Sequence, residues 1–467
     1  SSRAWSFQFL LVLGLAGASQ FFLAQKNLPS TLWSGLGFYL FSLLVLFKIL
    51  RPTPATKNPS PIKLSLKTER LLFGIIFTIA VFFRIYKLQE FPDGLFSDRA
   101  EVAFGALRIL KEHWRPFFEA FSLQVPELWI YYLVAGWFKL FGSSPDLFSY
   151  FDVALALAGL PFVYWTFRQI SGVPTALLTL FLLSTMRWNF LFARKINFDI
   201  QMIFFMFATL SFLFYGFRQK KSWAFLVSAG FLAFGFYSYQ AFKAFPLFLL
   251  ACGLFELWKK PKEAEKHTKN LLAFFLVTFV LVSPLLVWMV EQGSLGRRES
   301  EVSILTTIQR GNSLRPVFRN IVDWAEFFNR RYDTNGQSNY QGRRMLDDLT
   351  GTLFLLALAY GVSRIRERPA FYALGGIGVM SLPALLSENG GHAGRMLGVA
   401  PFVAYLCALL IMEFKNRLDW ISKSFRWRGW FFPGTLFYLL GLVALINFRN
   451  YFKEQVLEPV YLNDFSW

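Results

Sequence analysis

The chain has 467 residues, of which 55% are hydrophobic and 19% aromatic, with a formal net charge of +19 and a mean hydropathy of +0.41. Such an apolar composition excludes a water-soluble globule with a polar surface and indicates a polytopic, all-α membrane protein. The excess of Lys and Arg is typical of loops that face anionic lipid, so we expect no nucleic-acid partner. Cys252 and Cys407 lie inside apolar runs and are expected in the core rather than in a disulfide bond.

The hydrophobic pattern predicts about thirteen membrane-spanning helices, because a helix needs about 20 apolar residues to cross the hydrocarbon. The first stretch is long enough to remain as a spanning helix, so no cleaved signal peptide is expected. The predicted spans lie near residues 6–24, 31–49, 71–87, 146–167, 173–191, 200–217, 222–238, 244–258, 271–290, 349–362, 370–386, 396–412 and 430–447.

Lys and Arg concentrate in every second loop, which the positive-inside rule assigns to the cytoplasm together with the N-terminus. All of these basic loops lie on one side only if the segment 125–142, interrupted by Glu127 and Lys139, lies along the membrane interface instead of crossing the bilayer. The loops at 88–145, 192–199, 239–243, 291–348 and 387–395 then face the periplasm. The predicted organisation is a two-helix extension at 1–50, a cytoplasmic linker at 51–70, a transmembrane core at 71–447 and a periplasmic tail at 448–467.

Ionisable residues gather in the outward loops. An ionisable group at a membrane boundary is costly unless it is paired or in water, so such a cluster indicates a functional site. The candidates are Asp98, Glu101, Arg194, Lys195, Asp199, Lys243, His392 and Arg395.

Structural explanations exist for several of these residues. Asp98 with Glu101 resembles a capping box at the start of a helix, and Arg194 and Lys243 could extend along the bilayer edge to reach water. His392 has no second His or Cys nearby, so no metal site is expected. The loop 291–348 holds nine Arg and eight acidic residues, which fits phosphate recognition and internal ion pairs equally well.

The set of groups suits sugar transfer from a polyprenyl phosphate. One carboxylate would accept the proton of an acceptor hydroxyl that attacks the anomeric carbon, and fixed cations would bind the departing phosphate. A direct displacement needs one base and inverts the anomeric configuration, unlike the two-carboxylate arrangement of glycosidases.

The order of the motifs resembles bacterial membrane glycosyltransferases of family 39, in the GT-C superfamily with the protein O-mannosyltransferases and the aminoarabinose transferases of lipid A. The segments that carry the resemblance, over roughly 70–447, are "PDGLFSDRAEVAFGALRIL", "NFLFARKINFD", "GFYSYQAFKAFP", "RYDTNGQSNYQGRRMLDD" and "GGHAGRMLGVAP". The resemblance implies a GT-C fold and a polyprenyl-phosphate-sugar donor at the bacterial inner membrane. It implies no cofactor.

The resemblance also implies roles for individual residues. The catalytic Asp of the family's Asp-Glu pair matches Asp98, whereas Arg99 stands at the Glu position, with Glu101 one turn further on. The second outward Asp matches Asp199, beside Arg194. The expected contacts to the donor phosphate and sugar are Arg194, Lys195, Lys243, His392 and Arg395, and the long-loop motif matches Asp333, Asn339 and Gly342.

Three functions remain open at this stage. The first is an active transferase that acts on a glycan, lipid or protein acceptor. The second is a transferase-like subunit of a larger membrane complex that has lost its chemistry, which the departure at Arg99 favours. The third is a transporter of a lipid-linked sugar, although the repeated broken helices typical of transporters are not evident.

Overall fold

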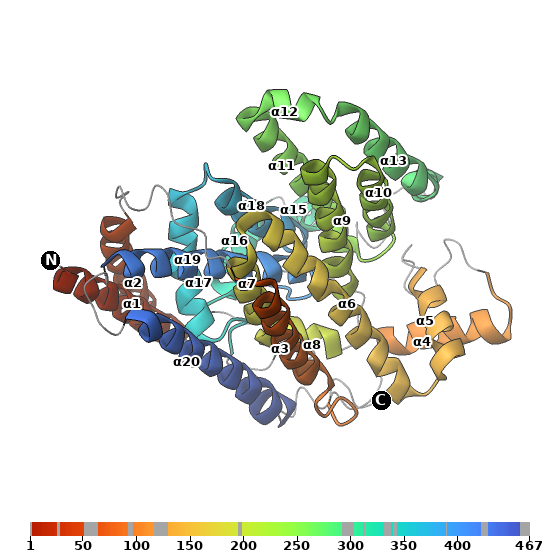
Figure 1. Ribbon diagram of the computed structural model, residues 1–467. Helices are drawn as coiled ribbons and strands as arrows, with labels where there is room; N and C mark the ends of the chain where they lie inside the picture. The colour runs from red at the N-terminus through yellow and green to blue at the C-terminus, as the bar shows by residue number, and fades with distance from the viewer. Residues whose placement is uncertain are drawn as a thin grey trace.

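The computed structural model describes residues 2–25, 29–50, 64–91, 97–115, 129–194, 199–291, 303–311, 313–330, 338–339, 343–388, 390–421 and 428–457. Over these ranges the chain is helical, and its only β-pairing is an isolated bridge between Ser303 and Ser387, which confirms the predicted all-α class (Figure 1). The elements are α1 (Ser2–Ala24), α2 (Pro29–Leu50), α3 (Leu66–Ile85), α4 (Ser97–Lys111), α5 (Trp129–Phe141), α6 (Pro145–Ser171), α7 (Val173–Thr185), α8 (Arg187–Arg194), α9 (Asp199–Gln219), α10 (Ser222–Phe236), η2 (Gln240–Ala244), α11 (Phe245–Lys259), α12 (Pro261–Glu265), α13 (Thr268–Glu291), α15 (Ile304–Gly311), α16 (Arg315–Phe327), α17 (Asp348–Ser363), α18 (Arg368–Leu385), η3 (Leu397–Val399), α19 (Ala400–Ile421), α20 (Arg428–Arg449), η5 (Asn450–Glu454) and η6 (Gln455–Leu457).

Seven helices in the described ranges are long and apolar enough to cross a membrane, or up to nine if each of two bent pairs is one span. The predicted number of about thirteen is therefore not confirmed. One predicted span, 173–191, is two helices, α7 and α8, which meet at an angle of 57°. Another, α10, has only 15 residues.

The centre of the bundle is built on α6, α7, α9 and α19. Helix α19 is apolar on every side, the pattern of a helix enclosed by others, and its residues 400–411 are buried. Helix α6 begins at Ser144, whose side chain accepts a hydrogen bond from the Leu147 amide, and it ends at Gly172 with a φ of 83°. Such a positive φ is accessible to glycine without a steric penalty, so the chain can turn directly into α7.

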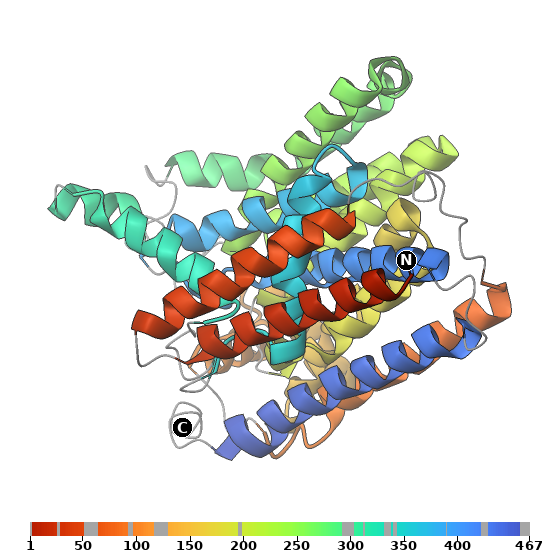
Figure 2. The same cartoon turned by 90° about the vertical axis from the view of Figure 1, so that its left-hand side faces the viewer.

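The N-terminal helices belong to the same bundle. Helices α1 and α2 lie side by side (Figure 2), and the Ser19 hydroxyl donates to the carbonyl of Gly35 at 2.7 Å. The Tyr39 hydroxyl donates to the carbonyl of Leu355 in α17 at 2.7 Å. The predicted two-helix extension is therefore packed against α17.

Helices α4 and α5 form a small second core with the start of α6. Its members include Val102, Ala106, Tyr131 and Phe148, and a Cβ on Gly105 would lie 3.0 Å from the Tyr131 ring. Helix α5 has 13 residues, about 20 Å of helix, which is too short for a bilayer core of about 30 Å. This length agrees with the expectation that 125–142 does not cross.

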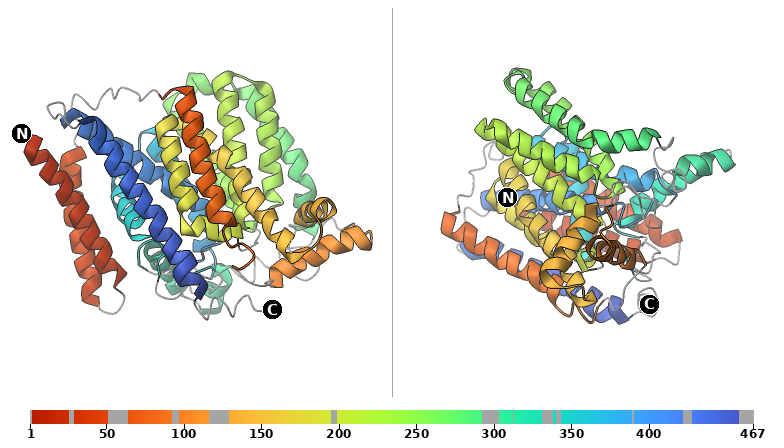
Figure 3. Two further views of the ribbon diagram at one scale, coloured as in Figure 1. Left: turned by 60° about the horizontal axis from the view of Figure 1, so that its bottom comes forward. Right: turned by 90° about the vertical axis from the view of Figure 1, so that its right-hand side faces the viewer.

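The bundle has two chemically different ends. At the end where α9 and α19 begin, which we call the loop end, α4, α5, α15 and α16 lie across the spanning helices (Figure 3, left). At the opposite end, ion pairs join neighbouring helices: Glu69 with Arg168, Glu256 with Arg368, and Glu413 with both Arg364 and Arg417. Each pair lies next to a loop that the sequence assigns to the basic side.

Candidate functional site

Helix α4 carries Asp98 at the loop end. The structure describes the backbone of Asp98 as the second residue of α4, and its side chain lies outside the described part. The next residue, Arg99, is 3% exposed and donates to the Ser149 hydroxyl and, at 3.3 Å, to the carbonyl of Pro145. The residue that follows Asp98 is thus a cation bound to the start of α6.

Burial lowers the pKa of Arg99 to about 10, while the carboxylates of Asp152 and Asp146 act in the opposite direction. A pKa of about 10 keeps the guanidinium charged at neutral pH. Its Cζ lies 5.5 Å from the centre of the Phe148 ring, a favourable cation–π distance.

Glu101 is buried one turn further along α4. Its Oε1 accepts a hydrogen bond from the Tyr131 hydroxyl of α5 at 3.2 Å. The contact ties α4 to α5, and it gives Glu101 a structural partner in the second core.

Asp199 begins α9 and is 1% exposed. A Cβ built on Gly394 would lie 2.4 Å from Asp199 Oδ2 and 3.3 Å from His392 Cε1. The Asp199 carboxylate and the His392 ring therefore both approach Gly394, so the start of α9 and the loop 390–396 meet. A carboxylate in the first turn of a helix is also favoured by the helix dipole.

The loop 390–396 is held from several sides. The Trp188 indole of α8 donates to the Ala393 carbonyl at 3.1 Å, and the Arg395 amide donates to His392 Nδ1 at 3.3 Å. Asn320 of α16 donates to the carbonyls of Leu385 and Ser387, at 2.9 and 2.5 Å, and its Oδ1 accepts from the Gly390 amide at 3.2 Å. Sequence analysis missed Asn320 and Trp188, because their partners are distant in the chain.

Arg194 is fully buried, and its hydrogen bonds go to the protein. The guanidinium donates to the carbonyls of Phe83, Arg84, Tyr86, Lys87 and Phe91 at 2.8–3.4 Å and to the Tyr451 hydroxyl at 3.3 Å. A guanidinium has five N–H groups, so these six contacts leave none for a phosphate. We therefore do not include Arg194 in the donor site proposed below.

Two of the remaining predicted cations, Lys243 and Arg395, lie at the same end. Lys243 belongs to η2 and is half-buried, and Arg395 is half-buried in the loop after α18. Lys195 lies outside the described residues.

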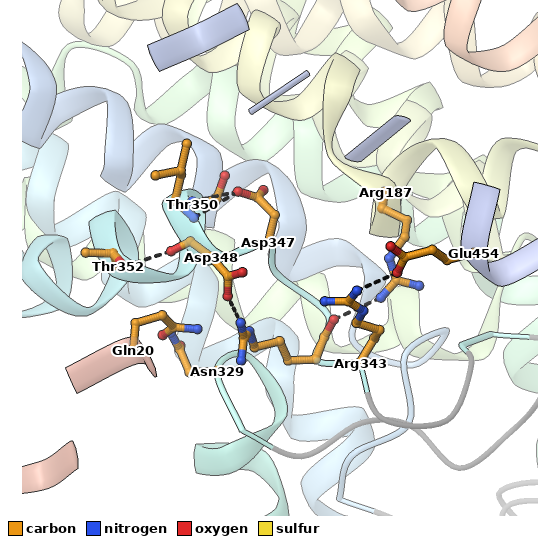
Figure 4. Close-up of polar contacts among 11 residues, drawn as sticks. Gln20, Arg187, Asn329, Arg343, Asp347, Asp348, Thr350, Thr352 and Glu454 are labelled. Carbon is orange, nitrogen blue, oxygen red and sulfur yellow. Dashed lines mark hydrogen bonds and ion pairs between the residues drawn. The ribbon is translucent and has the colours of Figure 1, made fainter. Parts of the chain in front are cut away.

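The end of the long loop joins a polar network with α8 and the C-terminal end of α20 (Figure 4). Asp347 caps α17, since its Oδ1 accepts from the amides of Leu349 and Thr350 at 3.1 and 3.0 Å, and its Oδ2 accepts from Asn447 at 2.8 Å. Arg343 pairs with Glu454 at 2.5 Å. This network fixes the C-terminal side of the long loop to the bundle.

Two further contacts extend the network. Arg187, which sequence analysis also missed, donates to Gln455 Oε1 at 2.8 Å and to the Arg344 carbonyl at 2.9 Å. Asn329 after α16 donates to Gln20 of α1 at 2.5 Å. Among the long-loop motif residues, Asn339 is buried and donates to the Arg343 carbonyl at 2.9 Å, and Asp333 and Gly342 lie outside the described residues.

No group of three or more His, Cys, Asp and Glu side chains that could hold a metal occurs in the described part of the chain. The free cysteines, Cys252 and Cys407, are buried.

Comparison with known proteins identifies the fold. A family model described as dolichyl-phosphate-mannose-protein mannosyltransferase matches residues 125–288, about a third of the chain. No curated protein sequence matches significantly.

Among solved structures, the chain is similar to the apo oligosaccharyltransferase of Archaeoglobus fulgidus, with a TM-score of 0.52 and 12% identity over 86% of this chain and 56% of that one. It is similar to the oligosaccharyltransferase AglB of the same organism in complex with an inhibitory peptide and a dolichol-phosphate, with a TM-score of 0.52 and 12% identity over 81% and 55% of the two chains. ArnT from Cupriavidus metallidurans bound to undecaprenyl phosphate gives a TM-score of 0.49 at 12% identity, over 86% and 78%.

These comparisons confirm the predicted GT-C resemblance, and the chain has the fold of a GT-C membrane glycosyltransferase. It spans about half the length of the oligosaccharyltransferases that it matches.

Proposed function

We propose that the chain transfers a sugar from a polyprenyl-phosphate donor to an acceptor at the periplasmic face of a bacterial inner membrane. The observation that carries the proposal is the meeting of the start of α9 and the loop 390–396 at the end of a GT-C fold where α4 also lies (Figure 3, left). A structure with this fold was solved with a dolichol-phosphate and a peptide, which supports a lipid-linked donor.

In the proposed reaction, Asp98 is the general base. The acceptor hydroxyl attacks the anomeric carbon and gives its proton to the Asp98 carboxylate, while the bond from the anomeric carbon to the phosphate oxygen breaks. The electron pair of that bond leaves with the polyprenyl phosphate. The product has the inverted anomeric configuration, because one displacement occurs.

Cations of the loop end would stabilise the leaving phosphate. Lys243 and Arg395, with Lys195, are the candidates for contacts to the donor phosphate, because charge-assisted hydrogen bonds to phosphate are short and strong. His392, whose Nδ1 accepts from the Arg395 amide, is the candidate for an uncharged contact to the phosphate or the sugar. Asp199 would position the loop 390–396 for contact with the donor, since its carboxylate lies against Gly394 and His392. The acceptor would be a glycan, a lipid or a protein.

The proposal is tested with the purified protein and a panel of radiolabelled polyprenyl-phosphate sugars, with membrane extract as the source of acceptors. Wild type should transfer label, and Asp98→Asn should lower the transfer rate by about 10² or more, the scale of removing a general base. Asn keeps the size of the side chain and most of its hydrogen-bonding capacity but lacks the basicity of a carboxylate, so equal activity of Asp98→Asn would refute its role as the base.

Two other outcomes would replace the proposal. A folded wild type that binds no donor and transfers no label would favour a structural subunit of a membrane complex. Movement of an intact lipid-linked sugar across proteoliposome membranes, without release of polyprenyl phosphate, would favour a transporter.

A further inference from the structure

We propose that Arg194 and Arg99 are positioning residues that fix the chain on both sides of Asp98. The inference rests on the proposed function, because it assigns the two arginines to the placement of the proposed base. It gives Arg194 a role other than phosphate binding and explains how a cation can replace the acid that the family resemblance implies at position 99.

On the N-terminal side, Arg194 holds the turn that follows α3. Its Nη2 donates to the carbonyls of Lys87 and Phe91 at 3.1 and 2.8 Å, and its Nη1 donates to the carbonyl of Tyr86 at 2.9 Å. Lys87 has a φ of 54°, a left-handed backbone conformation that is sterically unfavourable for a residue with a side chain. The Arg194 contacts therefore stabilise a backbone conformation that the turn residues do not favour on their own.

Arg194 is itself fixed to two other parts of the bundle. It is the last residue of α8, and its guanidinium carbon lies 5.3 and 5.0 Å from the ring centres of Tyr451 and Phe452 in η5, which follows α20. The turn 86–91 is thus attached to α8 and η5 through one side chain.

On the C-terminal side, Arg99 holds the first turn of α4 against α6. The contacts to Ser149 and the Pro145 carbonyl, and the cation–π contact with Phe148, all lie in the first two turns of α6. Asp146 and Asp152 in the same helix add electrostatic attraction. Because Asp98 is the neighbouring residue of the same helical turn, these contacts also set the position and rotation of the Asp98 backbone.

The two fixed points are close to Asp98 in the chain. Phe91, the last residue of the turn that Arg194 holds, is seven positions before it, and Arg99 follows it directly. A base must be placed within hydrogen-bond reach of the proton that it accepts, and a displacement of about 1 Å can lower a rate by about 10². Loss of either arginine should therefore reduce kcat more than it changes the KM for the donor.

The test compares variants that keep or remove these contacts. Arg194→Lys keeps the charge but cannot donate to five carbonyls, and Arg99→Met keeps the length but removes the donors. Each should lower kcat by about 10- to 100-fold, with a donor KM within about twofold of wild type. Arg99→Lys should recover only part of the loss, because Lys retains the charge and can donate to Ser149 but lacks the planar guanidinium. If Arg194→Lys or Arg99→Met does not fold, Tyr451→Phe and Ser149→Ala are milder variants that each remove one partner.

Arg168→Lys is the matched control, since Arg168 pairs with Glu69 at the opposite end of the bundle. Its kcat and KM should stay at the wild-type values. A kcat loss in the control as large as that in the test variants would overturn the positioning role, because the effect would then be general destabilisation.

Amide hydrogen exchange supplies a readout that does not need activity. Exchange in residues 86–91 should accelerate in Arg194→Lys, and exchange in 99–105 should accelerate in Arg99→Met, whereas α9 and α19 should keep wild-type rates. Unchanged exchange in both variants would overturn the inference, as would an increase in donor KM at constant kcat, which would return the arginines to donor binding. A wild type inactive on every donor would refute the proposed function, and the exchange result would still decide whether the arginines fix these segments.

Discussion

Replacement of Gly394 by Ala tests whether the loop 390–396 and Asp199 form one site. The added Cβ would lie 2.4 Å from Asp199 Oδ2, 3.1 Å from its Cγ and 3.3 Å from His392 Cε1. Asp199 is 1% exposed and begins a buried helix, so its carboxylate has little room to withdraw. The loop is also held next to Gly394, through the Ala393 carbonyl that accepts from Trp188.

The expected cost follows from this geometry. Adding a methyl group to a closely packed interior raises the free energy of the folded state by about 1–3 kcal/mol, and the 2.4 Å approach favours the upper half of this range. Gly378→Ala is the matched control, because Gly378 lies in α18 with nothing within 4 Å of the new Cβ. Ala is favoured over Gly in a helix interior by up to about 1 kcal/mol, so the two substitutions should change stability in opposite directions.

Both variants are measured by reversible unfolding in micelles and by label transfer. Gly394→Ala should lose stability and transfer activity together, and Gly378→Ala should lose neither. Adding Asp199→Ala removes the clashing atoms, so the double variant should be more stable than the sum of the single losses predicts. Equal behaviour of Gly394→Ala and Gly378→Ala, or strict additivity with Asp199→Ala, would refute the close approach of the two loops.

Three further substitutions test the surroundings of the site. Gly390→Ala would place a Cβ 2.5 Å from the Asn320 carbonyl oxygen and 2.6 Å from its Cα, backbone atoms that cannot rotate away, so unfolding free energy should fall by about 2–3 kcal/mol; a change as small as that of Gly378→Ala would contradict this contact. Asp347→Ala should cost about 2 kcal/mol, the upper end for loss of an N-cap, because the carboxylate also accepts from Asn447, and Asp347→Asn should cost less in the same unfolding assay. Glu69→Gln should lower stability by about 1 kcal/mol and leave the transfer rate unchanged, since its partners Arg168 and Tyr164 lie at the opposite end; a slower transfer would show that the two ends are coupled.

The fold class could be predicted because apolar length and charge spacing are local properties of the sequence. The break between α7 and α8 could not, because it depends on a distant residue. After α7 ends, the Arg187 amide donates to Asn447 Oδ1 at 3.0 Å. That partner lies 260 positions away in α20, and no pattern within 173–191 indicates it.

The candidate site shows the same division between local and distant information. The alternation of basic loops predicts that Asp199 and His392 lie at one end of the bundle, and the structure has both beside Gly394. The sequence also marked Arg194 as a cation at the border of a predicted outward loop, and the structure makes it the last residue of α8. The sequence could not indicate that carbonyls 103–111 positions earlier surround the guanidinium. For this reason Arg194 was predicted to bind the donor, whereas its hydrogen bonds go to the protein.

Buried charge is compensated differently at the two ends, and this difference bears on the choice of substrate. At the ion-pair end, Glu69 and Glu256 each meet an arginine and a tyrosine. At the loop end, Arg84 and Arg194 are both fully buried, and the acceptors described for them are carbonyl, amide and hydroxyl oxygens. The C-terminus of α3, to which both are bound, supplies about half a negative charge through its helix dipole, so two guanidinium groups exceed it by about one and a half charges. Buried charges are screened by salt much less than exposed ones, and their field attracts anions over a longer range than a hydrogen bond. An anionic lipid phosphate at this end would therefore be stabilised even by arginines that do not contact it. Weaker donor binding alone thus does not identify a variant that has lost a phosphate ligand, and kcat and KM must both be measured to distinguish such a variant from one that has lost a positioning arginine.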